Sequence, residues 1–202
     1  TWFGAPTSPG NLKNNSMFLP WPAAPDNLSV TQVGTGKPWV TIQSIAAVRL
    51  KEPFAAGYAI TKTIPPVEQG DKSLPAGTYS RGDVLRVKLE VNASADMTWV
   101  AITDPVPAGA TILGSGLGRD SEIATQGEKR EGWAWPAFEE RSFESFRSYY
   151  QYIPKGKISM EYTVRLNNAG EFSLPASRVE ALYAPEMFGE YPNAKVKVVI
   201  KK

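Results

Sequence analysis

The sequence of 202 residues contains no cysteine and no histidine, and these two absences exclude most catalytic and metal-binding chemistry. Without cysteine there is no disulfide framework, no thiolate nucleophile and no Cys-based metal site. Without histidine there is no His-based acid/base catalysis, and the usual serine and cysteine triads cannot form. Only carboxylates remain for catalysis, so we expect a chain that is not an enzyme and that holds no metal and no cofactor.

Neither an excess of charge nor a long apolar run is present. The 22 basic and 20 acidic residues give a net charge of +2, which predicts no nucleic-acid or anionic membrane partner. No apolar run approaches the roughly 20 residues that span a bilayer, so we expect no direct membrane insertion. The chain starts at Thr1 without a charged-then-apolar leader, which suggests a processed product or a fragment of a longer protein.

The rest of the chain is organised around Met97–Leu113, MTWVAITDPVPAGATIL. Its two apolar runs are short, rich in Val, Ile, Thr and Trp, and separated by prolines and a glycine that predict a turn over Thr103–Gly109. Trp99 and Val100 would face opposite sides, so both faces of this strand carry apolar residues. We predict a buried central strand, which requires a second layer of sheet over it.

Strict alternation of apolar and polar residues predicts further strands on both sides of this stretch. They are Tyr58–Thr63, Asp83–Val91, Ile158–Leu166, Phe172–Leu174, Arg178–Tyr183 and Lys195–Ile200. Phe138–Ile153 fits helical and strand spacing, and we favour a strand paired with Ile158–Leu166 across the turn at Pro154. The predicted fold is therefore all-β, an antiparallel β-sandwich of macroglobulin or immunoglobulin type.

The first part of the chain is too small to bury a core by itself. Short strands are predicted near Met17–Leu19, Leu28–Val33 and Pro38–Leu50, and Lys51–Ala56 is predicted to be a linker. We expect a partial β segment over residues 1–52 and a β-sandwich domain over residues 53–202.

Four short motifs could carry chemistry, and each has a more ordinary interpretation. Gly114–Gly118 is glycine-rich but lacks phosphate-loop spacing, and Arg81-Gly82-Asp83 opens a strand, where turn residues are common. Three glutamates with Asp104 could form a hydrolase pair, but nearby arginines favour a charge-balanced surface. These glutamates are Glu139, Glu140 and Glu144. Trp133 and Trp135 could stack on a sugar, although we favour a plug folded back over the sandwich.

The last candidate is a predicted loop over Ala184–Asn193. With Tyr183 in front, it contains YAPEMFGEY, which carries more apolar surface than a turn needs. An exposed loop would be a contact patch, whereas a folded-in loop would cap one end of the sandwich. The residues leave these two interpretations open.

Three ordered segments of the second part resemble a known family. They are ITDPVPAG, FRSYYQYIPKGKISMEYTVRLNNAGEF and LPASRVEALYAPEMFGE. Together they resemble the C-terminal, last macroglobulin-like domain of the bacterial α2-macroglobulins, from about Ala55 to the end. VTQVGTGKPWVTIQSIAAV, within residues 1–52, resembles the second half of the CUB-like domain that precedes it.

This resemblance implies a non-catalytic domain of a broad-range protease inhibitor of the periplasm, whose parent could be lipid-anchored. In the family a protease cuts a bait region, the parent changes shape, and a Cys-Gln thioester can capture the protease. The implied partners are the thioester domain and other macroglobulin-like domains of the same parent, with target proteases bound through it. The implied thioester-shielding residues are Tyr183, Glu186, Met187 and Phe188.

Two other classes of function stay open at this point. The chain could be a carbohydrate-binding or adhesion sandwich with Trp133 and Trp135 as its site. It could also be a structural spacer of a cell-envelope protein, in which no exposed residue has a special role.

Overall fold

The chain divides into two units, Thr1–Ala47 and Val48–Lys202. The computed structural model describes residues 18–21, 24, 27–37, 39–45, 49–114 and 127–200. Within the described part of the first unit no strand forms, so the strands predicted at Leu28–Val33 and Pro38–Leu50 are not formed there. The reason is that no layer covers their apolar side chains, since Val33 is 89% and Trp39 is 100% exposed. Met17 lies outside the described residues.

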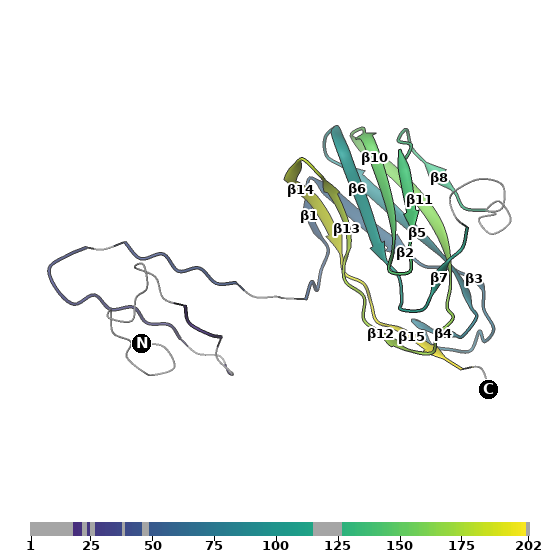
Figure 1. The fold of residues 1–202 in the computed structure, drawn as a ribbon, viewed down its shortest axis with the longest axis horizontal. Coiled ribbons are helices and arrows are strands. Elements are labelled where there is room, and N and C mark those ends of the chain that lie inside the picture. The colour runs from purple at the N-terminus through teal and green to yellow at the C-terminus, as the bar shows by residue number, and fades with distance from the viewer. Residues whose placement is uncertain are drawn as a thin grey trace. The chain divides into compact units, whose positions relative to one another are not determined.

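The second unit consists of strands, and its described residues contain no helix (Figure 1). The strands are β1 (Phe54–Ala56), β2 (Tyr58–Thr63), β3 (Pro66–Glu68), β4 (Thr78–Ser80), β5 (Val84–Ala93), β6 (Met97–Pro105), β7 (Thr111–Ile112), β8 (Arg130–Glu131), β9 (Phe138–Arg141), β10 (Ser145–Ile153), β11 (Gly156–Arg165), β12 (Gly170–Phe172), β13 (Ser177–Ala181), β14 (Ala184–Tyr191) and β15 (Val196–Val199).

Two sheets form the sandwich, and a smaller third sheet lies at one end. The first sheet has the order β1-β14-β13-β6-β10-β9, and the second has the order β2-β5-β11-β7, with β3 beside β5 and β8 beside β11. The small sheet has the order β12-β15-β4 and contains a parallel pair, β15 with β4. All other strand pairs are antiparallel, as the all-β sandwich prediction requires.

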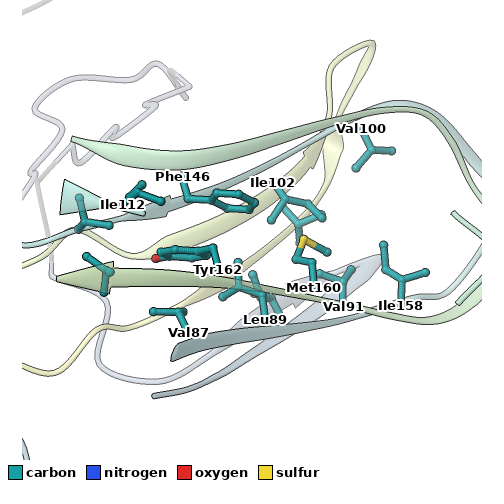
Figure 2. Packing of buried hydrophobic residues seen from close by; sticks show 14 of the residues in the cluster. Val87, Leu89, Val91, Val100, Ile102, Ile112, Phe146, Ile158, Met160 and Tyr162 are labelled. Atoms are coloured by element: carbon teal, nitrogen blue, oxygen red, sulfur yellow. The ribbon is translucent and has the colours of Figure 1, made fainter. Parts of the chain in front are cut away.

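The core lies between the two large sheets (Figure 2). Strand alternation supplies it, because Leu85, Val87, Leu89 and Val91 of β5 are all buried while the residues between them are more exposed. From the facing sheet Phe146 stacks on Tyr162, with ring centroids 4.5 Å apart and planes 13° apart. The predicted alternation of apolar and polar residues in Asp83–Val91 is confirmed.

The predicted central strand is an inner strand of the first sheet. β6 lies between β13 and β10, and Val100 and Ile102 are fully buried. The strand continues to Pro105, which pairs with Ser145, so the turn begins later than the predicted Thr103. Proline is tolerated there because β13 pairs with β6 only as far as Thr103, so β6 has a neighbour on one side alone at Pro105.

Three local predictions are wrong. The segment Phe138–Ile153 does form strands, but β10 pairs with β6 and β9, whereas β11 pairs with β5. The turn at Pro154 therefore crosses between the two sheets, since both strands have an apolar face that needs the same core. The predicted linker contains β1, and the predicted loop Ala184–Asn193 is mostly strand β14, which pairs with β1 and β13.

Candidate functional site

The predicted shielding residues lie on β14 and on the turn before it. β13 ends at Ala181, Leu182 and Tyr183 turn the chain, and β14 returns beside β13. Gly189 of β14 is buried, and a Cβ there would collide with the backbone carbonyl of Tyr58. Glycine at this position therefore lets β14 lie directly against β2.

Met187 and Phe188 point to opposite faces of the sheet because they are neighbours on a strand. Met187 is partly buried against the core, and a Cβ on Gly57 would overlap the end of its side chain. Phe188 instead stacks on Phe54 of β1, with centroids 5.3 Å apart, and the Arg178 guanidinium lies 4.5 Å from its ring centroid. The two residues thus do not form one apolar lid.

Arg178 is held in place by two carboxylates. Its Nε donates to Glu180 at 2.8 Å and its Nη1 donates to Glu190 at 2.6 Å. The guanidinium therefore lies over the Phe188 ring, where its charge meets the negative face of the aromatic system. The outer face of β13 and β14 thus carries one arginine held between two glutamates.

An aromatic pair stands at the turn between β13 and β14. Tyr183 is 81% exposed and meets Trp99 of β6 edge to face, with ring centroids 6.4 Å apart. Trp99 has φ of 55°, a left-handed backbone that bulky residues rarely adopt, and its carbonyl accepts a hydrogen bond from the Leu182 amide at 2.8 Å. We call Trp99, Leu182, Tyr183 and Glu186 the turn patch; all four are exposed.

Trp99 was not predicted to be a surface residue, because its position in an apolar run predicts burial. It is 48% exposed, and the backbone reversal at this residue turns its side chain outwards. No pattern in the sequence indicates a positive φ at a tryptophan. The turn patch offers aromatic contact area and one carboxylate, which suits binding to another surface rather than catalysis.

The other predicted motifs are separated by the fold. Trp133 and Trp135 are 93% and 77% exposed, so they do not form the predicted plug over the sandwich. Asp83 is buried and accepts hydrogen bonds from the amides of Gly70 and Ser80. The tripeptide that it ends is therefore built into a turn, and of the glycine-rich motif at Gly114–Gly118 only Gly114 lies within the described residues.

Three of the four carboxylates considered for hydrolysis form ion pairs. Glu139 bonds to Arg130, and Glu140 lies 3.2 Å from Arg147. Asp104 is buried in the core, where Lys62 lies 2.7 Å from it. Among the described residues no group of acidic side chains could hold a metal ion. Nor do those residues contain a helix that is long and apolar enough to cross a membrane.

Comparison with known proteins identifies a family. Residues 57–186 match the model of the bacterial α2-macroglobulin MG10 domain. An α2-macroglobulin homolog of Nostoc sp. is 27% identical over 125 residues, which is 62% of this chain and 6% of the relative.

Two solved structures share the fold. Salmonella α2-macroglobulin reacted with methylamine matches with a TM-score of 0.55 and 21% identity over 73% of this chain and 10% of that chain. Trypsin-activated Escherichia coli α2-macroglobulin matches with a TM-score of 0.56 and 20% identity over 73% of this chain and 11% of that chain. The chain thus spans a small part of each relative.

These matches confirm the resemblance on which the fold and family were predicted. Because the family model covers more than half of the chain, and because the sandwich has the fold of solved members, the chain belongs to the bacterial α2-macroglobulins, of which it is a macroglobulin-like domain.

Proposed function

We propose that this chain is the non-catalytic C-terminal region of a periplasmic protease trap, and that its MG10 sandwich packs against a thioester domain. The observation that carries the proposal is the turn patch, in which Tyr183 is 81% exposed beside Trp99. An exposed aromatic pair at the end of a sheet has the character of an interface anchor. The first 47 residues, which form a separate unit, would complete a CUB-like domain in the parent.

The chemistry of the relatives supports a reactive acyl group elsewhere in the parent. The Salmonella protein reacts with methylamine, a small amine nucleophile, and the E. coli protein is activated by trypsin. An activated acyl bond survives only where water is excluded, so a neighbouring domain must cover it before activation. This chain has no cysteine and cannot supply the thioester itself.

The predicted residues would contribute to shielding in different ways. Tyr183 and Glu186 lie in the exposed turn patch and would make the contact with the thioester domain. Met187 packs against the core beside Gly57, so it would support β14 from below and supply a flexible apolar surface. Phe188, stacked on Phe54, would hold the strand from its other face.

The rate of free-thiol appearance in the full-length parent tests this proposal. Wild type should release thiol only after a protease is added, whereas Tyr183→Ala and the double variant Met187→Ala/Phe188→Ala should release it spontaneously. Trp135→Ala is the matched control, because it removes an equally exposed aromatic outside the turn patch. If all variants stay silent like wild type, the patch does not shield a thioester. If no sample releases thiol even with protease, the parent carries no thioester.

A second function is favoured by the exposure of Trp133 and Trp135. Two exposed indoles near each other in the sequence could form a stacking platform for a sugar, as in a carbohydrate-binding or adhesion module. Binding of the isolated chain to polysaccharide, lost in Trp133→Ala/Trp135→Ala and kept in Tyr183→Ala, would support this role. If the chain does not bind polysaccharide and the variants release thiol as described above, only the shielding role is supported.

A further inference from the structure

The side-chain amine of Lys62 lies inside the sandwich, within hydrogen-bond distance of a carboxylate and a side-chain amide. Nζ of Lys62, on β2, is 2.7 Å from Oδ1 of Asp104 and 3.0 Å from the side-chain oxygen of Asn193. The side chains of Lys62 and Asp104 are 3% and 0% exposed, and Asn193 is buried as well. A nucleophile, a carboxylate and an amide carbonyl are therefore held together out of water.

A serine closes these groups into a ring. The Asn193 amide nitrogen donates to Ser177 Oγ at 3.0 Å, and the Ser177 hydroxyl donates to Oδ1 of Asp104. The hydroxyl of Tyr162 donates to the other carboxylate oxygen at 2.5 Å, which fixes the orientation of Asp104. Each participant comes from a different segment of the sandwich, so only the folded chain brings them together.

Beyond these polar partners, the surroundings of the lysine are apolar. A small cavity of about 20 Å³ beside Lys62 is lined by core side chains that include Leu85, Val87 and Val164. An ion pair in such surroundings loses its hydration, and transfer of one proton from lysine to aspartate replaces two buried charges with two neutral groups. The neutral amine that results is a nucleophile.

We propose that Lys62 and Asn193 join in an intramolecular isopeptide bond, formed by the folded domain itself, with Asp104 as the catalytic acid and base. Asp104 accepts a proton from Nζ of Lys62, and the nitrogen lone pair attacks Cγ of Asn193. Ser177, which touches both Asp104 and the departing nitrogen, passes a proton to Nδ2. The Cγ–Nδ2 bond then breaks, and its electron pair leaves with the nitrogen.

The atoms balance without any further reactant. One of the three protons of the Lys62 ammonium stays on the new amide nitrogen, and the other two join the two on Nδ2. Ammonium leaves, and Asp104 is a carboxylate again. Asn193 stands in the wall of a surface cleft of about 280 Å³ that also contains Pro175 and Arg49, and this cleft provides an exit for the ammonium.

The bond would join β2, the second strand of the sandwich, to the segment between β14 and β15. These residues are 131 positions apart, so the link closes nearly the whole domain. It would act on the unfolded chain as a long-loop cross-link does, by reducing its conformational freedom. This inference does not depend on the proposed shielding role.

Intact-mass spectrometry of the purified wild-type chain under denaturing conditions is the decisive measurement. The expected mass is that of the sequence minus one ammonia molecule. After proteolysis, the peptides that contain Lys62 and Asn193 should be recovered as one branched species. A wild-type mass equal to that of the sequence, after incubation of the folded chain at neutral pH, overturns the proposal.

Loss of ammonia can also arise from cyclisation of Asn193 onto the backbone of Ala194, so a variant must separate the two reactions. Lys62→Arg keeps the positive charge beside Asp104, but its guanidinium is too weak a nucleophile at neutral pH to form the bond. The isopeptide predicts that this variant has the full sequence mass. If Lys62→Arg still loses ammonia, the loss belongs to Asn193 alone and the proposal is wrong.

The role of Asp104 is tested by Asp104→Asn, which should fold with both Lys62 and Asn193 present but unlinked, and so show the full mass. If Asp104→Asn does not fold, Ser177→Ala serves instead and should slow the loss of ammonia from freshly refolded chain. An unchanged rate in Ser177→Ala would remove Ser177 from the mechanism. Linkage in a folded Asp104→Asn variant would contradict the catalytic assignment.

Discussion

Phe146 of β10 stacks face to face on Tyr162 of β11, and this contact joins the two sheets at the centre of the sandwich (Figure 2). Both rings are fully buried, and the Tyr162 hydroxyl reaches past Phe146 to Asp104. The stack therefore links the apolar core to the buried polar ring described above. β10 and β11 are adjacent in sequence but lie in different sheets, and this stack is a contact between them.

Truncation of this stack should strongly destabilise the domain. Phe146→Ala leaves a cavity against Tyr162, and we expect a loss of about 3–5 kcal/mol in the free energy of unfolding. Phe143→Ala is the matched control, because Phe143 is 81% exposed and should change stability by less than about 0.5 kcal/mol. Denaturant titration of both variants measures the difference. Equal effects would show that the stack is not a main contributor to stability.

The domain should lose stability at alkaline pH through its buried tyrosines. Burial raises the pKa of Tyr58 from 10.0 to about 12, and burial together with Asp104 raises the pKa of Tyr162 well above its ordinary value. The unfolded chain releases these protons from about pH 10, while the folded chain retains them, so the free energy of unfolding falls as pH rises. Neither tyrosine changes the free energy of unfolding below about pH 10, and the Tyr58 effect lowers it progressively from about pH 10 to about pH 12.

Tyr58→Phe isolates this effect. The Tyr58 hydroxyl has no hydrogen-bond partner among the described residues, so its removal should leave stability at pH 7 unchanged or raise it by about 1 kcal/mol. The fall in the free energy of unfolding at alkaline pH should be smaller in Tyr58→Phe than in wild type. Unfolding free energies of wild type and variant, measured at several values between pH 8 and about pH 12, give both slopes. Parallel slopes would mean that Tyr58 does not contribute.

Met187 is held in position by the absence of a side chain at Gly57. Gly57→Ala places a Cβ against the methionine and also strains a backbone with φ of 91°. Gly82→Ala strains a similar backbone, φ 97°, but its Cβ would meet nothing within 4 Å. Each backbone change costs about 1 kcal/mol or more, and Gly57→Ala should cost a further 1–3 kcal/mol through overpacking. Equal melting temperatures for the two variants would show that Met187 moves aside freely.

Trp99 should contribute little to the stability of the domain and more to the proposed contact with the thioester domain. Its φ of 55° is unfavourable for any residue with a side chain, so Trp99→Gly should be about 1 kcal/mol more stable than Trp99→Ala. In the full-length parent both variants should release thiol early if the turn patch is the shield that we propose. Thermal unfolding of the isolated chain measures the first effect. If Trp99→Gly is less stable than Trp99→Ala, strain at this residue does not govern its stability.

Much of the sandwich was predictable because burial imposes a period of two on a half-buried strand. Asp83–Val91 and Ile158–Leu166 show this alternation, and both are strands close to the predicted limits. The macroglobulin fold itself was predicted from the family motifs. Pairing was less predictable: the aromatic strand β10 lies in the other sheet from β11, although only a tight turn separates them.

The sequence indicated candidate residues for a contact site but not their geometry. YAPEMFGEY has a proline and a glycine that indicate a loop. Pairing with β1 and β13 nevertheless makes it a strand, on which Met187 and Phe188 face opposite ways. The partner strand Phe54–Ala56 is three residues long and gives no periodic signal. Trp99 was predicted as buried, because nothing local encodes its left-handed backbone.

The sequence by itself determined the fold class, the family and the absence of cysteine and histidine chemistry, because composition, alternation and motifs are properties of neighbouring residues. Only the tertiary structure decided which strands pair, where Trp99 and Tyr183 meet, and that Lys62, Asp104, Ser177 and Asn193 share one buried ring. These residues are far apart in the chain, and the two sheets bring them together to bury a common core. Contacts of that kind depend on packing between layers, which no local pattern records.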